Sequence, residues 1–188
     1  DHKLYVWEPF DDTNACAWSV FDPFAGTWSR LAELSTNCTE YMSLVVDPVK
    51  QVSIAIGSAG SADPGGNFWM DIAAGSAHAI HHPAVDSTCA GLAHAASPAL
   101  TWDSRRQQVV GYPGSGGSIY VVSADIQLGT ITCVSESYGS TVGVDVPEDN
   151  NASGGAGEVF NKLHYDAPDD AYILSDNSDQ PAWVLNRR

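Results

Sequence analysis

Short runs in which apolar and polar residues alternate fill much of the chain, and segments rich in Asp, Pro and Gly separate them. The clearest case is the stretch 18–28, where an alternating run ends at Phe21, a short turn follows, and a second run begins at Trp28. A period of two residues predicts β-strands, because successive strand side chains point to opposite faces of a sheet. No long stretch carries apolar residues at helical spacing, so the pattern predicts an all-β, turn-rich chain.

The turn of this hairpin recurs along the chain. An Asp is followed, after three residues, by Gly and then by a small hydroxyl residue at 22–27, 71–76 and 125–130. Each occurrence therefore predicts the hairpin between two neighbouring strands.

A second pattern lies upstream of each later hairpin. An apolar strand ends at Asp47, Asp103 or Asp166, and a second apolar strand follows a short turn. An Asp at this position accepts hydrogen bonds from backbone N–H groups two residues further on. This pattern therefore predicts a second kind of tight strand connection.

Together, the two patterns define a repeated unit of four strands, called a, b, c and d in chain order. The unit predicts two blades at 41–82 and 98–134, a partial blade at 1–40 that begins with b, and a partial blade at 159–188 that ends with c. Four-stranded antiparallel units at such a period indicate a β-propeller. The strands predicted in the partial blades are 3–8, 15–21, 27–34, 159–165, 171–175 and 181–185.

Residues 1–188 are thus expected to form a single β-propeller segment with about three to four visible blades. A closed propeller commonly completes its last blade with a strand from the other terminus, but strands b and c at the two ends do not complete one blade. We therefore predict part of a larger propeller or one of several chains that close a ring. A freestanding ring is the alternative.

Within the 18–28 hairpin, Val20-Phe21-Asp22-Pro23 followed by Trp28 resembles the third and fourth strands of the kelch-type β-propeller repeat. The resemblance implies a β-propeller. The same turn is also similar, to a lesser degree, to the Asp box of sialidase-type propellers. Families of both kinds include carbohydrate-active enzymes and binding proteins, so function has to come from the site.

Charge narrows the range of partners. The chain has 23 acidic and 8 basic residues and a formal net charge of -15. Nucleic-acid binding needs clustered Lys and Arg, so a nucleic-acid partner is excluded. The same charge disfavours an anionic membrane surface, and the absence of a long apolar segment predicts no membrane insertion.

The number and spacing of the cysteines indicate the cellular compartment of the protein. Cys16, Cys38, Cys89 and Cys133 lack the C-x-x-C spacing of a zinc site, and their even number predicts two disulfides. Three connectivities are possible, and we favour Cys16 with Cys38 and Cys89 with Cys133, since each pair joins neighbouring strands. Disulfides predict an oxidising compartment, hence a secreted or periplasmic protein.

Long, unlike loops are expected on one face of the propeller, at 57–66, 83–97, 113–117 and 135–158, opposite the short turns. Variable loops on a rigid scaffold usually carry binding sites. This face is therefore the predicted ligand-binding surface. Its candidate residues are His81, His82, His94, Asp63, Tyr112, Asp145, Glu148 and Asp149.

Two metal sites are conceivable on this face. His78, His81 and His82 form a His-x-x-His-His motif that suits copper, zinc or iron, although neighbouring strand residues point to opposite faces. The loop with Asp145, Glu148 and Asp149 offers the oxygen ligands that calcium prefers, so calcium is the candidate cofactor; a solvated acidic loop is the alternative.

These observations predict an extracytoplasmic, kelch-like propeller that acts as a binding or assembly module. The expected partners are a glycan or protein ligand and a further propeller segment or other chains. One alternative is part of a carbohydrate-active enzyme, either a metal-dependent oxidase or a polysaccharide lyase in which His94 and Tyr112 abstract a proton. Another is a structural subunit of an extracellular assembly.

Overall fold

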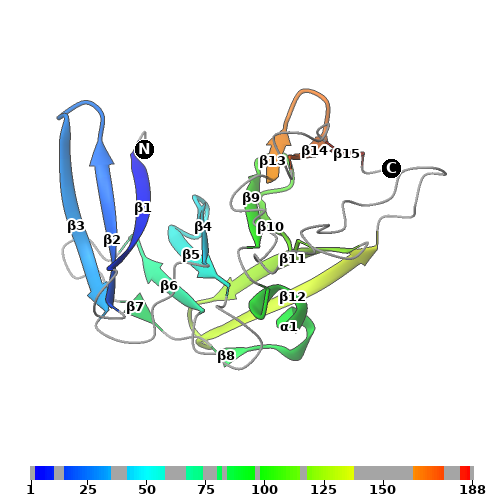
Figure 1. Ribbon diagram of the computed structural model, residues 1–188, viewed down its shortest axis with the longest axis horizontal. Coiled ribbons are helices and arrows are strands. Elements are labelled where there is room, and N and C mark those ends of the chain that lie inside the picture. Colours follow the sequence, from blue (N-terminus) through cyan, green and yellow to red (C-terminus); the bar gives the residue numbers. More distant parts are fainter. Residues whose placement is uncertain are drawn as a thin grey trace, which may run out of the picture.

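The computed structural model confirms an all-β chain with four mainly antiparallel sheets in series, shown in Figure 1. The described residues are 3–10, 15–34, 42–57, 67–73, 80–81, 84–95, 98–114, 118–137, 163–175 and 183–186. Within them, successive sheets follow one another along an open arc and do not close into a ring. No described helix is long and apolar enough to span a membrane.

Sheets A and B come first in the chain. Sheet A consists of β1 (Leu4–Phe10), β2 (Ala15–Asp22) and β3 (Thr27–Leu34). Sheet B consists of β4 (Ser43–Asp47), β5 (Val52–Ile56), β6 (Phe68–Asp71) and β7 (Ile80–His81).

Sheets C and D follow. Sheet C has the order β8 (Ala84–Val85), β12 (Thr130–Ser137), β11 (Ser118–Asp125), β10 (Gln108–Tyr112) and β9 (Ala99–Asp103). Sheet D consists of β13 (Leu163–Asp166), β14 (Ala171–Leu174) and β15 (Trp183–Asn186). The predicted strands at 3–34 and 171–185 match the observed ones closely, and β3 has the predicted bounds.

One segment differs from the prediction. The predicted loop 83–97 contains β8, a 3-10 helix η3 (Ser87–Cys89) and a one-turn helix α1 (Ala90–Ala93). Strand β8 pairs with β12 in parallel, so sheet C has five strands instead of four. Asp86 stabilises the start of η3, because its side chain accepts a hydrogen bond from the Thr88 N–H.

Four of the six predicted Asp turns are present with the expected hydrogen bonds, and the predicted turn at 71–76 lies partly outside the described residues. At each of four turns, the same Asp oxygen accepts hydrogen bonds from two backbone N–H groups two and three residues ahead. The four Asp residues are Asp22, Asp47, Asp103 and Asp125. The residue that ends each of these four turns has a positive φ of 54 to 67°, which is costly for any residue except Gly. These residues are Gly26, Gln51, Gln107 and Gly129, and Asp170 has a similar φ of 49° at the end of the turn before β14.

Each pair of neighbouring sheets encloses its own apolar cluster. Trp18 of sheet A packs with Phe68 and Met70 of sheet B. Between sheets B and C the cluster includes Ile54 and Val109. A third cluster joins sheets C and D and is described below. All five residues of β5 are buried, because sheet B is covered on both faces.

The a strands lie next to one another along the series. Strand β4 contacts β9, and β9 contacts β13. Sheets B, C and D therefore meet along their a strands, the relation that neighbouring blades of a propeller have. Along the row Val110, Val121 and Val134 in sheet C, burial falls from the fully buried Val110 to Val134, which is 63% exposed.

A glycine lets α1 pack closely on sheet C. A Cβ atom at Gly111 would lie 2.7 and 2.9 Å from the two terminal carbons of Leu92, and 3.0 Å from Leu100. Both leucines are buried, so neither side chain has room to move away. Because Gly111 of β10 has no side chain, Leu92 can fill this part of the core.

Gly111→Ala is expected to destabilise the chain by about 2 kcal/mol, because the added methyl group overpacks the core. Urea unfolding followed by tryptophan fluorescence measures the change. In the Gly111→Ala background, Leu92→Ala should cost less than it does in the wild type, since the truncation relieves the clash. Additive effects would contradict close packing at this position.

Candidate functional site

Most of the predicted ligand-face and metal-site residues lie outside the described residues. They are Asp63, His78, His82, Asp145, Glu148 and Asp149. Their convergence on a ligand or a metal stays a prediction. In the part of the chain that the structure describes, no three His, Cys, Asp or Glu side chains form a group that fits a metal ion.

The three remaining candidates occupy different places. His81 belongs to β7, where its backbone pairs with Trp69. His94 is exposed at the end of α1, whereas Tyr112 is buried in the cluster between sheets C and D. Helix α1 packs on the opposite face of sheet C, in the cluster shared with sheet B. The described contacts therefore do not pair His94 with Tyr112.

The favoured disulfide between Cys89 and Cys133 is confirmed, with a Cα–Cα distance of 5.0 Å. It fastens η3 to β12, next to the parallel contact of β8. Cys16 is also disulfide-bonded, and its predicted partner, Cys38, lies outside the described residues.

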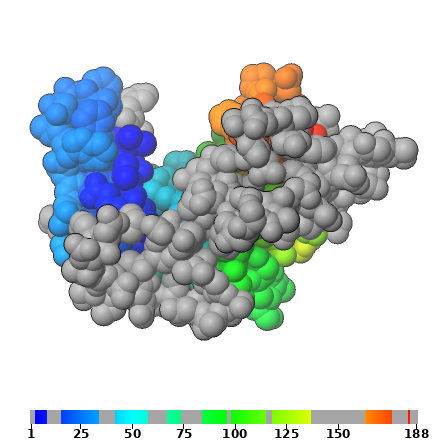
Figure 2. All heavy atoms as spheres, viewed as in Figure 1, coloured from blue at the N-terminus to red at the C-terminus, as the bar shows by residue number. Residues whose placement is uncertain are grey.

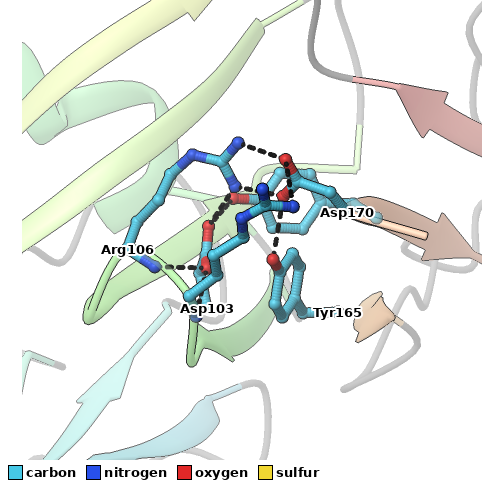
Figure 3. Close-up of polar contacts among 6 residues, drawn as sticks. Asp103, Arg106, Tyr165 and Asp170 are labelled. Atoms are coloured by element: carbon cyan, nitrogen blue, oxygen red, sulfur yellow. Dashed lines mark hydrogen bonds and ion pairs between the residues drawn. The ribbon is translucent and has the colours of Figure 1, made fainter. Parts of the chain in front are cut away.

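An ion-pair cluster around Arg106 lies between the a–b turns of sheets C and D, shown in Figure 3. Arg106 Nη1 donates to Asp103 Oδ2 at 3.0 Å and to Asp170 Oδ1 at 2.5 Å, and its Nη2 donates to Asp170 Oδ2 at 2.8 Å. Asp103 ends β9 and Asp170 ends the turn before β14. One guanidinium group therefore bridges two successive sheets.

Two tyrosines complete the cluster. The Tyr172 hydroxyl donates to Asp103 Oδ2 at 2.6 Å, and the Tyr165 hydroxyl donates to Asp170 Oδ1 at 2.8 Å. The Asp103 side chain is fully buried, whereas those of Arg106 and Asp170 are about one quarter exposed. Arg105 adds an outer contact to Asp170 at 3.3 Å. The negative charge of the buried Asp103 carboxylate is thus compensated by hydrogen bonds to both of its oxygens.

Protonation equilibria follow from this geometry. The Arg106 hydrogen bonds and, after them, the hydrogen bond from the Tyr165 hydroxyl together lower the pKa of Asp170 to about 2. Burial acts to raise the pKa of Asp103, but hydrogen bonds from Tyr172 and Arg106 outweigh it and hold that pKa below its usual value. Burial and the hydrogen bond to Asp170 raise the pKa of Tyr165. Both carboxylates are therefore charged at neutral pH and hold the arginine in place.

Asp170 makes stability sensitive to acid. Its pKa is about 2 in the folded chain and close to 3.8 in an ordinary environment, so its ion pair contributes fully above pH 4 and is lost between about pH 4 and 2. Asp170→Asn should flatten this part of the stability profile, measured by urea unfolding at stepped pH. An unchanged acid slope would contradict the ion pair.

Single polar contacts also join the other sheets. The indole N–H of Trp18 in sheet A donates to Ser53 Oγ in sheet B at 2.7 Å. The ammonium group of Lys50, in the a–b turn of sheet B, donates to Ser123 Oγ and to the Ala124 carbonyl oxygen of sheet C, both at 2.8 Å. The three interfaces therefore combine an apolar cluster with at least one polar contact.

The outward face of sheet D repeats a row that is buried elsewhere. Its cross-strand row is His164, Ile173 and Val184. The corresponding row in sheet B is Val45, Ile54 and Trp69, and in sheet C it is Thr101, Val110 and Val121. Ile54 and Val110 are fully buried under the following sheet, whereas Val184 is 57% exposed.

The outward face of sheet A carries an aromatic row. Leu4, Phe21 and Trp28 are paired across β1, β2 and β3, and the rings of Phe21 and Trp28 lie 5.1 Å apart. Leu4 and Trp28 are each 56% exposed. In Figure 2, sheet A (blue) lies at the left of the molecule and the orange part of sheet D lies at the top. Both terminal sheets thus present apolar rows to solvent in the described structure.

Comparisons with known proteins leave the family open. No protein-family model matches the chain, and no curated protein sequence matches it. The chain is similar to a crystal structure of TolB from Acinetobacter baumannii, with 13% sequence identity and a TM-score of 0.45. The similarity covers 98% of this chain and 40% of the TolB chain, so the chain spans less than half the length of that protein.

Sequence reasoning missed the ion-pair cluster. Arg105 and Arg106 form one of only two Arg pairs in a strongly acidic chain, and Asp103 begins a predicted turn. The arginine pair and Asp103 lie in the same turn, so the sequence does place positive charge beside an acidic turn residue at this point. The partner Asp170 was not identifiable, because it lies 64 residues from Arg106.

Proposed function

We propose that the chain is a segment of an extracytoplasmic, kelch-like β-propeller that acts as a binding or assembly module. The observation that carries the proposal is the serial, face-to-face packing of four sheets, of which B, C and D meet along their a strands. Repeated blades of this kind form a rigid scaffold, and function resides in the loops at its rim and in its exposed faces.

The cluster around Arg106 supports a scaffolding role. Its charged groups are bound to one another, so it offers no unoccupied base or nucleophile for a reaction. Its effect is to fix the position of sheet D on sheet C. The compartment is supported by the Cys89–Cys133 disulfide, since such bonds persist in secreted and periplasmic proteins.

The ligand is proposed to be a glycan or a protein bound at the face opposite the short turns. The loop that ends at 158 carries the candidate calcium ligands Asp145, Glu148 and Asp149. Calcium would then order this loop by binding its carboxylates. The His-rich segment at 78–82 belongs to the same proposed face.

A glycan array and titration calorimetry on the full chain, with and without calcium, test this proposal. Saturable binding that is lost when residues 138–158 are replaced with a Gly/Ser segment is the expected result. A matched control replaces the short turn 126–128 in the same way and should retain binding. Release of shortened or oxidised sugar would instead identify an enzyme, and absence of binding to glycans and extracellular proteins would contradict a binding role.

A further inference from the structure

The outer edge of β12 is paired along only part of its length. Strand β12 spans Thr130–Ser137, and β8 pairs in parallel with its first two residues, Thr130 and Ile131. No other described strand pairs with this edge of β12. Beyond Ile131, the edge therefore has no strand beside it in the described part of the chain.

A turn at Asp86 ends the pairing of β8. The Asp86 N–H still donates to the Ile131 carbonyl oxygen at 2.9 Å. In a longer parallel ladder, the Asp86 carbonyl would accept the next hydrogen bond from the Cys133 N–H. It accepts from the Cys89 N–H instead, because the chain turns into η3. The segment then leaves the edge and packs on the face of sheet C, and the arrowhead end of β12 extends beyond α1 in Figure 1.

The register shows which backbone groups of β12 point outward. Within a strand, alternate residues direct their N–H and C=O groups to the same side. Because Ile131 bonds to β8, the N–H and C=O groups of Cys133 and Ser135 also point away from β11. No hydrogen bond between described residues reaches these backbone groups. They are therefore donors and acceptors that a further strand can use.

The other d strands have features that discourage such pairing. Strand β7 has only two residues, and β3 carries the exposed ion pair of Arg30 and Glu33. Short strands and charged side chains are common means of protecting a sheet edge. The unpaired part of β12 has one charged residue, Glu136, whereas Val134 is 63% exposed. Among these three d strands, β12 is therefore the one suited to accept a strand.

We propose that the edge of β12 at residues 133–136 binds an extended, basic peptide segment of a partner protein by strand addition. In this mode, main-chain hydrogen bonds provide affinity and alternate side chains provide specificity. The pairing of β8 shows that this edge accepts a strand, so the peptide would continue an existing ladder.

Charge selects the kind of peptide. The chain has a formal net charge of -15, and Glu136 lies at the edge itself, so Lys or Arg in the peptide complements the surface. The same net charge disfavours a second copy of the chain as the occupant, because two such copies repel one another. The site goes beyond the proposed function, since it consists of strand backbone and includes none of the candidate ligand-face residues.

Fluorescence anisotropy on the full chain tests the site with a labelled peptide, acetyl-Lys-Thr-Val-Thr-Val-Lys-amide. Ser135→Pro removes the outward N–H and should raise the dissociation constant at least fivefold. Ser135→Ala loses the same hydroxyl group but keeps the N–H, so it should bind like the wild type. Pro is tolerated on edge strands where the N–H faces solvent, and circular dichroism verifies folding. A wild type that does not bind the peptide, or equal binding by the two variants, would overturn the proposal.

Two N-methylated forms of the peptide provide a test that needs no protein variant. One form is methylated on the N–H groups of its second, fourth and sixth residues, and the other on those of its third and fifth residues. In an added strand only one of these sets faces β12. One form should therefore bind at least fivefold more weakly than the other. Equal affinities would show that the peptide does not pair as a strand.

Hydrogen exchange locates the bound peptide. With saturating peptide, exchange of the Ser135 amide should slow at least tenfold, because its N–H becomes hydrogen-bonded. The Val134 amide is the internal control, since it points towards β11 and should change less. Protection of other segments without protection of Ser135 would place the peptide elsewhere and overturn the site.

The remaining outcomes separate the alternatives. A wild-type dimer in sedimentation velocity that Ser135→Pro dissociates would identify a second copy as the occupant and overturn the peptide proposal. Peptide binding that Ser135→Pro abolishes, in a chain that binds no ligand at its loop face, supports the β12 site and contradicts the proposed function. Ligand binding that depends on residues 138–158, in a chain that binds no peptide, has the opposite meaning.

Discussion

Replacing Arg106 with methionine is expected to lower the free energy of unfolding by about 3 kcal/mol. The substitution keeps an apolar stem and removes the guanidinium group that pairs with Asp103 and Asp170. Asp103 is fully buried, so its carboxylate would keep only the Tyr172 hydroxyl and backbone N–H groups as partners. Removing one partner of a buried pair is costly because the remaining charge is left without compensation. Urea unfolding measures the loss.

The neighbouring Arg105 provides a matched control. Its side chain is 62% exposed and contacts Asp170 at 3.3 Å, so Arg105→Met should cost less than about 1 kcal/mol. In addition, Asp103→Asn should cost less in the Arg106→Met background than in the wild type, since it removes the uncompensated charge. Equal losses for the two arginine variants would contradict the bridging role of Arg106.

Removing the Cys89–Cys133 disulfide is expected to destabilise the chain by about 3 kcal/mol. The bond closes a segment with a sequence separation of 44, so its loss gives the unfolded chain more conformational freedom. In the folded chain, the bond joins η3 to β12 and holds Leu92 against Gly111. Urea unfolding of the Cys89→Ala/Cys133→Ala variant measures the change.

Hydrogen exchange locates that effect. Amides of residues 84–95 should lose protection first in the disulfide variant, because this segment is fastened to sheet C by the disulfide and a two-residue parallel strand. Amides of β5 serve as the internal control, since their strand is buried on both faces. Uniform loss of protection in both segments would contradict a local anchoring role.

The sequence predicts the strands well where their pattern is local. The 18–28 hairpin, with Asp22 at the start of its turn and Gly26 at its end, folds as the alternation and turn chemistry indicate. The segment 84–95 could not be predicted in this way. The helix in this segment is only four residues long. The segment is held in place by contacts with Cys133, Ile131 and Gly111, which lie far away in the chain.

The candidate sites show the same limit. Asp103 could be predicted as a turn residue, but its ion pair with Arg106 and its hydrogen bond to Tyr172 depend on how sheets C and D pack. Likewise, the apolar rows on the outward faces of sheets A and D become visible only through the strand register. Contacts between sheets arise from tertiary packing, which alternation within one strand does not encode.

The central claim is that successive sheets pack on one another as propeller blades. Nuclear Overhauser contacts between sheets in the isotope-labelled chain test it most directly. We predict contacts of the Trp18 indole proton with Ser53, and of the Tyr172 ring with the Val110 methyl groups. Strand-to-strand contacts within each sheet, without these contacts between sheets, would contradict it.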